Sequence, residues 1–181
     1  MFTFDHEWVK QQMKETSVEE VLEKNWPGLH IEPLQAPENM EVLIGWTGSP
    51  ASSPHLVSEV KRLKSDPIFY GEFLDQSNTC VENLIYAFKT NNIKGVQKMI
   101  RQNRSIIQQM DKEATVDIET KKLKLLCDIG ERFGGAAKTS GAGGGDCGIT
   151  IIDNRVDKHS IYEVWEKEGI KPLKFKIYHG Q

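Results

Sequence analysis

Seven of the chain's 15 glycines lie between Gly134 and Gly148, close to one lysine, two hydroxyl side chains and one aspartate. Glycine lowers the stability of a fold unless the backbone needs unusual dihedral angles or a close approach to another group. Successive backbone N–H groups that no side chain shields can form a concave site for an anion such as a phosphate. A lysine adds positive charge to such a site, and an aspartate accepts hydrogen bonds from a substrate hydroxyl. The sequence therefore predicts a phosphate-binding loop made of Lys138, Thr139, Ser140, Gly141, Ala142, Gly143, Gly144, Gly145 and Asp146.

A flexible hairpin between two strands is the alternative interpretation of the same stretch. Hairpin connections usually take about two to five residues with one or two glycines, so the stretch is long and rich in glycine for that role alone. It is not a Walker A loop either, because Lys138 precedes the glycines and no Gly-Lys-Ser/Thr sequence follows. The chemistry of the loop favours ligand binding.

A second group of hydroxyl side chains, Ser49, Ser52 and Ser53, precedes Pro54 and an apolar pattern with helical spacing. Serine at such a place most often caps a helix. The free N–H groups and the dipole of a helix start also favour an anion. Capping is our first interpretation of these serines, and an anion contact is the second.

The remaining polar residues give weaker signals. Arg104 beside Asn103 belongs to a basic stripe typical of a solvated helix face, although its guanidinium could also reach an acidic ligand. Cys147 has no histidine near it in the sequence, so we interpret it as a small buried hydrophobic residue. The five histidines lack the spacing of metal ligands, and we predict no metal site in this chain.

Length and composition limit the class of protein. A chain of 181 residues with 38% hydrophobic and 27% charged residues is typical of one globular domain. A net charge of -3 argues against nucleic acid as the main partner. No apolar run approaches the length of a membrane span, and the first residues lack the pattern of a signal peptide. Three cysteines without CxxC spacing argue against disulfides and zinc, so we expect a cytoplasmic protein without a membrane partner.

The elements that must position the loop follow from the spacing of apolar residues. Strands are predicted in residues 29–34, 40–47, 149–152 and 172–178. Helices are predicted in residues 18–26, after Pro54, around 81–88, 96–110 and 123–133, and between Asp157 and Gly169. This order predicts an α+β fold, in which a mostly antiparallel sheet carries helices on one face.

Three stretches of the sequence resemble a known family. They are EVLIGWTGSPASSPHLV at 41–57, QNRSIIQQMD at 102–111 and, above all, KTSGAGGGDCGI at 138–149. The last is similar to the C-terminal glycine-rich motif of the GHMP kinases, and together the three look like the phosphomevalonate kinase branch of that family in bacteria. The resemblance covers essentially the whole chain and implies the family's C-terminal domain, a ferredoxin-like antiparallel sheet with inserted helices.

Members of that branch transfer the γ-phosphoryl group of ATP to the phosphate of phosphomevalonate, assisted by Mg²⁺, in the mevalonate route to isoprenoids. The resemblance implies that the loop from Lys138 to Asp146 lines the place where the substrate and nucleotide phosphates meet. It also implies that Ser52 and Ser53, which we first interpreted as helix caps, can contact the substrate. Ser49, Asn103 and Arg104 remain weaker candidates from their own chemistry.

The GHMP kinases also have an N-terminal half with a PxxxGLGSSA phosphate loop and a catalytic aspartate, and this sequence contains no such loop. We therefore expect the C-terminal domain alone, with residues 1–35 connecting it to that half. Such a chain is expected to be catalytically incomplete, without a general base and without tight binding of ATP or Mg²⁺. Two alternatives stay open: a module that binds a phosphorylated metabolite without chemistry, and the corresponding domain of mevalonate kinase.

Overall fold

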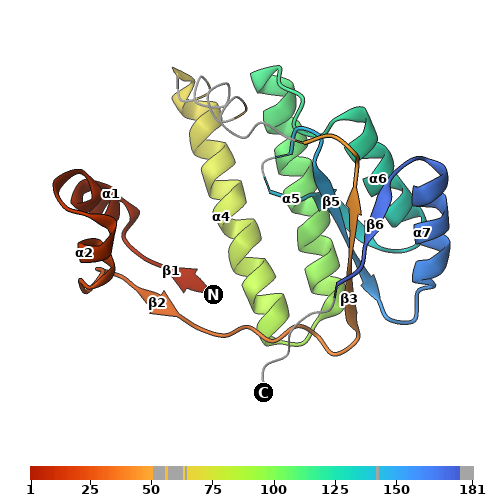
Figure 1. Ribbon diagram of the computed structural model, residues 1–181, viewed down its shortest axis with the longest axis horizontal. Coiled ribbons are helices and arrows are strands. Elements are labelled where there is room, and N and C mark those ends of the chain that lie inside the picture. Colours follow the sequence, from red (N-terminus) through yellow and green to blue (C-terminus); the bar gives the residue numbers. More distant parts are fainter. Residues whose placement is uncertain (51–55, 57–62, 64, 142, 176–181) are drawn as a thin grey trace. The chain divides into compact units, whose positions relative to one another are not determined.

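The computed structural model describes residues 1–50, 56, 63, 65–141 and 143–175, and the chain divides into two compact units, Met1–Gln35 and Ala36–Gln181 (Figure 1). In the first unit, strands β1 (Phe2–Thr3) and β2 (His30–Ile31) pair antiparallel. Helices α1 (His6–Glu15) and α2 (Val18–Leu22) come between these strands in the sequence. That residues 1–35 connect the chain to another domain stays a prediction.

The second unit is built on a four-stranded sheet. In chain order the strands are β3 (Met40–Trp46), β4 (Ala136–Thr139), β5 (Cys147–Asp153) and β6 (Lys171–Leu173), and across the sheet the order is β4-β5-β3-β6. Every neighbouring pair is antiparallel. Helix α6 (Lys121–Arg132) precedes β4, and helix α7 (Lys158–Lys167) joins β5 to β6. This is the βαββαβ order of a ferredoxin-like fold, so the predicted fold class is confirmed.

Two further helices, α4 (Pro67–Lys89) and α5 (Ile93–Ala114), are inserted between β3 and α6. They pack through Ala87, Val96 and Ile100 against Ala136 of β4 and Ile151 of β5. The next residues along these strands, Ala137 and Ile152, face the opposite way and pack with α6 and α7. Helices therefore cover both faces of the sheet (Figure 1).

The predicted placement of helices on one face is thus right for α6 and α7 and wrong for α4 and α5. The physical reason lies in β5, where Ile149, Ile151 and Ile152 put apolar side chains on both sides of the strand. A strand of that kind is buried on both faces. A sheet covered on one side would instead alternate apolar and polar residues.

Several predicted element ends need correction. The helix predicted at 18–26 ends at Leu22, and the strand predicted at 29–34 contains only His30 and Ile31. Helix α1 and strand β4 were not predicted. Of the strand predicted at 172–178, the structure describes residues up to Phe175 and ends β6 at Leu173. The helix predicted after Pro54 falls on residues of which the structure describes only Leu56 and Leu63.

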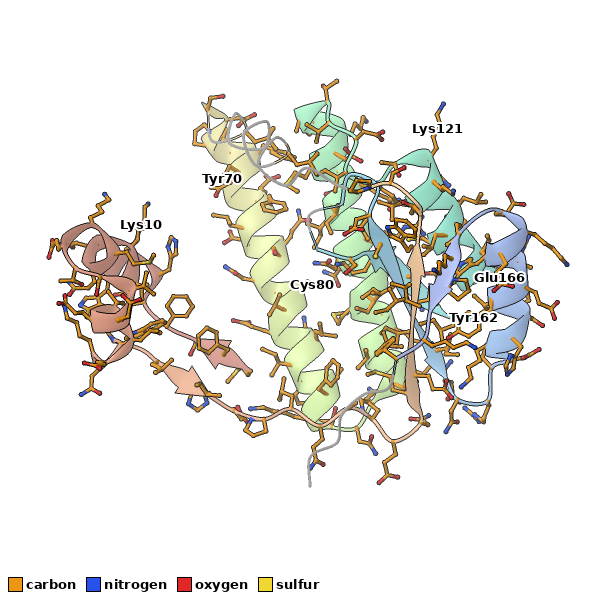
Figure 2. All side chains as sticks on the ribbon, in the orientation of Figure 1. Lys10, Tyr70, Cys80, Lys121, Tyr162 and Glu166 are labelled. Atoms are coloured by element: carbon orange, nitrogen blue, oxygen red, sulfur yellow. The ribbon has the colours of Figure 1, made fainter. Side chains whose placement is uncertain are left out.

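The break between α4 and α5 is where the sequence predicted it. Asn91 adopts a left-handed φ of 52°, which asparagine tolerates better than most residues. The side chain of Asn92 then accepts the N–H of Gly95 at 2.9 Å and caps α5. Cys80 of α4 (labelled in Figure 2) donates its thiol to the carbonyl of Met99 in α5 at 3.3 Å, which ties the two helices together.

The outer edge of β4 is covered by a charged pair. The N–H of Ala137 donates to Oε1 of Glu131 at 3.1 Å, and Arg101 donates both to Glu131 at 2.6 Å and to the carbonyl of Gly135. An uncovered edge strand offers its N–H and C=O groups to other chains, so this cover prevents edge-to-edge pairing. Among the described residues, no helix has both the length and the apolar character needed to cross a bilayer.

Candidate functional site

The glycine-rich segment joins β4 to β5. The strands pair up to Thr139 opposite Gly148, and the N–H of Ser140 donates to the carbonyl of Cys147 at 2.8 Å. Lys138 and Thr139 therefore lie in β4, and the connection consists of residues 140–146. Its topology is that of a hairpin, as the alternative interpretation held, but it is longer than the usual hairpin turn. The binding role of the loop stays a prediction.

The loop is anchored on the segment between α5 and α6. Gly144 donates its N–H to the carbonyl of Ile118 at 2.8 Å. Gly143 has φ +79°, and a Cβ placed there would lie 2.4 Å from that same carbonyl oxygen. No L side chain fits this position without moving the backbone of one segment or the other. The glycine at 143 is thus required both by its dihedral angle and by the close approach of Ile118.

The two segments that the sequence singled out meet at this end of the sheet. The N–H of Thr47, at the end of β3, donates to the carbonyl of Asp146 at 2.9 Å. A Cβ at Gly145 would lie 3.8 Å from the Cβ of Ser49 and 3.9 Å from Cγ2 of Thr120, the N-cap of α6. The loop, the Ser49 turn and the start of α6 therefore lie close together at this end of the sheet. Ser52, Ser53 and Ala142, which were also predicted to bind, lie outside the described residues.

Lys138 supplies a partly buried positive charge beside the loop. It pairs with Ile149 and, by the alternation of β4, lies on the same face as Ala136, toward α4 and α5. Its Nζ donates to the carbonyl of Thr139 at 2.7 Å. Burial lowers the pKa of the Lys138 ammonium, with smaller opposing contributions from Cys127 and Cys80. A cation with little water around it attracts an anion more strongly than an exposed one does.

Hydroxyl and acidic side chains at the loop differ in accessibility. Thr139 is 1% exposed, and its Oγ1 makes no hydrogen bond within the described part of the chain. Ser140 is half-buried, whereas Asp146 is exposed at the surface. Burial and the neighbouring Asp146 raise the pKa of the Cys147 thiol, but the residue is only half-buried, and its role in packing stays a prediction.

Arg104 does not lie on a solvated helix face. Its side chain is only 11% exposed and donates to both oxygens of Glu119, at 2.9 and 2.6 Å, and to Asp128 at 2.8 Å. Two carboxylates thus already occupy the guanidinium, and Asn103 next to it is half-buried. The role of both residues as ligand contacts stays a prediction, and the geometry favours a structural one for Arg104.

The structure adds residues that sequence reasoning missed. Ile118 and Thr120 border the loop through a backbone carbonyl and a helix cap. A carbonyl contact leaves no trace in the type of residue, so only the fold reveals it. Thr120 did carry a signal, because a threonine before the apolar helical pattern that begins at Leu123 is a typical N-cap.

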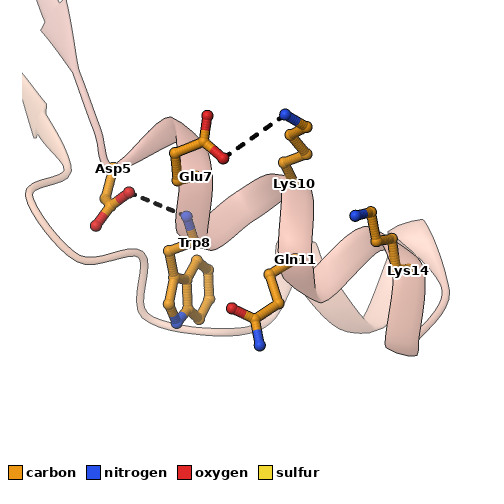
Figure 3. Close-up of a pocket in the computed structure, with 6 residues that line it drawn as sticks. All are labelled: Asp5, Glu7, Trp8, Lys10, Gln11 and Lys14. Atoms are coloured by element: carbon orange, nitrogen blue, oxygen red, sulfur yellow. Dashed lines mark hydrogen bonds and ion pairs between the residues drawn. The ribbon is translucent and has the colours of Figure 1, made fainter.

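A separate recess of about 650 Å³ lies on α1 in the first unit (Figure 3). Its lining residues are Asp5, Glu7, Trp8, Lys10, Gln11 and Lys14. Glu7 and Lys10 pair with each other at 3.6 Å, and Asp5 accepts the N–H of Trp8 at 3.0 Å as a helix cap. Glu7 and Lys10 thus offset each other's charge, and Asp5 serves as the cap of α1.

Comparisons with known proteins identify the domain. Residues 84–171 match the family described as "GHMP kinases C terminal". The curated phosphomevalonate kinase of Streptomyces sp. (strain CL190) is 34% identical over 172 residues, which is 93% of this chain and 46% of that protein. The chain thus spans about half the length of that relative.

Solved structures agree with this result. A Lin0012 protein from Listeria innocua, known from a crystal structure, is 39% identical in sequence to this chain, with a TM-score of 0.87. The match includes 97% of this chain and 50% of the Listeria chain. Streptococcus pneumoniae phosphomevalonate kinase, solved in complex with phosphomevalonate and AMPPNP, is 27% identical in sequence, with a TM-score of 0.77. The match includes 95% of this chain and 49% of the Streptococcus chain.

Proposed function

The chain carries a GHMP kinase C-terminal domain, and from this premise we propose that it serves an ATP-dependent phosphomevalonate kinase. The reaction would transfer the γ-phosphoryl group of ATP to the phosphate of phosphomevalonate and yield diphosphomevalonate and ADP. Two polyanions must be brought together in such a transfer, so positioning and neutralisation of charge supply most of the rate enhancement. The proposed task of this chain is to hold the phosphate of the acceptor.

One observation carries the proposal: the glycine loop, the Ser49 turn and the start of α6 converge at the end of the sheet where β4 carries Lys138, a partly buried cation. Among the described residues, the amides of Gly143 and Gly145 have no hydrogen-bond acceptor. In our proposal they donate to phosphate oxygens, and Lys138 offsets part of the negative charge. The identity of 34% to a phosphomevalonate kinase over 93% of the chain supports this assignment.

The reaction of the family uses Mg²⁺, but the described part of this chain does not contain a binding site for this metal. No group of three or more histidine, cysteine, aspartate or glutamate side chains that could hold a metal is found among the residues that the structure describes. Asp146 is a single exposed carboxylate at the loop. Mg²⁺ usually retains several waters and needs further oxygen ligands, so these residues do not fit a resident ion.

The test is a titration of the chain with phosphomevalonate, followed by the amide NMR signals of residues 141–146 and of Ser49. We expect saturable shifts in these two segments and none at the far end of the sheet, near Asp153. Titration with mevalonate, which lacks the phosphate, separates the assignment from a mevalonate kinase domain. Equal responses to both ligands, or no response to phosphomevalonate at millimolar concentration, would count against the proposal.

A further inference from the structure

The segment behind the glycine loop is held by a carboxylate of α5. Asp111, in the last turn of α5, accepts the N–H of Ile118 at 2.9 Å with one oxygen and the N–H of Glu119 at 3.0 Å with the other. Both amides belong to the segment that runs from α5 to α6. A carboxylate that binds two neighbouring backbone amides fixes their peptide planes, because charged acceptors make the stronger hydrogen bonds.

A second connection binds the same segment to α5. Glu119 is 4% exposed, and its two oxygens accept from Arg104, which also binds Asp128 of α6. Gln108 of α5 donates to the same carboxylate at 3.2 Å. A buried carboxylate needs such partners, and together they restrain the side chain of Glu119. The segment between Asp111 and α6 is therefore held by three side chains of α5, Arg104, Gln108 and Asp111, and Arg104 is in turn bound to Asp128 of α6.

The held segment is the support of the loop. The carbonyl of Ile118, whose own N–H is bound by Asp111, accepts the N–H of Gly144. Ile118 is 4% exposed, and Gly143 lies so close to it that no Cβ would fit. A shift of this carbonyl would therefore move Gly143 and Gly144 together.

We propose that Asp111 and the Arg104–Glu119 pair are positioning residues, which set the conformation of the glycine loop through the carbonyl of Ile118. This inference rests on the proposed function only for its effect on ligand binding. Arg104, whose sequence pattern suggested a solvated face or a ligand contact, thereby acts on the site without touching the ligand. Arg104 binds the carboxylate of Glu119, and Asp111 binds the backbone N–H groups of Ile118 and Glu119. The carbonyl of Ile118 in turn accepts the N–H of Gly144.

The test compares two isosteric variants of the full chain, Asp111→Asn and Asp153→Asn. Each removes a carboxylate that accepts a backbone N–H, but Asp153 binds Arg155 and Asn39 at the opposite end of the sheet. The measured quantity is the rate of amide hydrogen exchange at Gly144, followed by NMR without ligand. Each variant is measured at the same number of degrees below its own melting temperature. We expect exchange at Gly144 to be about tenfold faster in Asp111→Asn than in Asp153→Asn, the effect of weakening one charge-assisted hydrogen bond.

If Asp111→Asn folds poorly, the variant Arg104→Lys provides an independent test. Arg104→Lys retains the positive charge but loses the two-pronged contact with Glu119. It should accelerate exchange at Gly144 in the same selective way, by about threefold, a smaller weakening of a hydrogen bond. Equal exchange at Gly144 in these variants and in Asp153→Asn would overturn the inference.

Ligand binding separates this inference from the proposed function. If the unaltered chain binds phosphomevalonate, Asp111→Asn should raise the Kd by about fivefold while Asp153→Asn changes it less than about twofold. An unchanged Kd in Asp111→Asn would contradict the positioning role. If the unaltered chain does not bind, the proposed function fails, and the exchange rate of Gly144 still decides whether Asp111 positions the loop.

Discussion

Two groups of glycines in this chain serve opposite purposes. Where α6 crosses the sheet, a Cβ at Gly148 would lie 2.5 Å from Cδ2 of Leu126, and one at Gly130 would lie 2.5 Å from Oγ1 of Thr150. In the loop, by contrast, a Cβ at Gly141 would meet nothing within 4 Å, and its φ is +61°. The first group lets a helix approach a sheet, and the second gives the backbone a conformation that other residues avoid. Gly143 combines a left-handed φ with a close approach, in its case to the carbonyl of Ile118.

This difference separates stability from binding. Packing glycines should matter for the free energy of unfolding and hardly for the ligand, because they lie in the core below the site. Loop glycines should matter for the ligand more than for stability, because the loop lies at the surface end of the sheet. The four variants below test that separation, beginning with the largest expected effect.

Gly148→Ala should cause the largest loss of stability. The added methyl group overlaps the fully buried side chain of Leu126, so we expect a loss of about 2–3 kcal/mol in the free energy of unfolding. Urea unfolding followed by circular dichroism measures it. The Kd for phosphomevalonate, measured well below the melting temperature, should change less than about twofold.

Leu126→Ala provides the control for Gly148→Ala. Each single substitution destabilises, but in the double variant the smaller side chain makes room for the new methyl group. The combined loss should therefore be less than the sum of the single losses by about 1 kcal/mol. Simple additivity would show that the methyl group at 148 is accommodated by a movement of α6 and not by Leu126.

Gly143→Ala should affect both properties, and binding more strongly. The new Cβ would collide with the carbonyl of Ile118 and would hold a left-handed φ, so the loop must rearrange. We expect about 1–2 kcal/mol less stability and a Kd for phosphomevalonate raised by at least about tenfold. Urea unfolding and an NMR titration of one sample give both numbers. Unchanged binding would remove the loop from the ligand site.

The sequence predicted the loop better than its support. The glycine cluster, the Ser49 turn, the helix breaks at Asn91 and Gly134 and the antiparallel sheet all follow from local signals. Strand β4 was missed, because two alanines before Lys138 show neither strand alternation nor a helical stripe. The support of the loop by Ile118 was out of reach, because it depends on a backbone carbonyl of the segment between α5 and α6 that the fold brings close to Gly144.

Lys138 shows why burial could not be predicted either. In the sequence it reads as the cation of a loop, whereas its place in β4 puts it against α4 and α5. The same is true of Arg104, whose stripe of basic residues is typical of a solvated face. Charge patterns along one helix say nothing about the carboxylates that another segment brings to it.

Lys138→Met should have an intermediate effect that separates stability from binding most clearly. Burial lowers the pKa of Lys138 below its usual 10.5, so the folded state binds this proton less tightly than the unfolded state. At neutral pH both states carry the charge, which costs the folded state free energy. Stability should therefore rise with pH in the window between the lowered pKa and 10.5, as the folded state loses the proton first.

The variant removes both the cost and the charge. We expect Lys138→Met to gain about 0.5–1 kcal/mol at pH 7, to lose the rise of stability at alkaline pH, and to weaken binding of phosphomevalonate by at least about tenfold. Lys98→Met, at an exposed lysine of α5, is the matched control and should change neither quantity. A loss of stability in Lys138→Met at pH 7 would mean that the bond from Nζ to the carbonyl of Thr139 outweighs the cost of burial.

Gly141→Ala should have the smallest effect on ligand binding among the loop variants. Its Cβ meets nothing within 4 Å, so the only cost is the left-handed φ of +61°, about 1 kcal/mol for a residue with a side chain. Gly141→Asn should cost less than Gly141→Ala, because asparagine tolerates this conformation. For both variants the Kd for phosphomevalonate should rise less than about threefold. If Gly141→Ala instead weakens binding as much as Gly143→Ala does, the open space at Gly141 is where the ligand lies. The phosphate would then rest on the tip of the loop and not against its supported side.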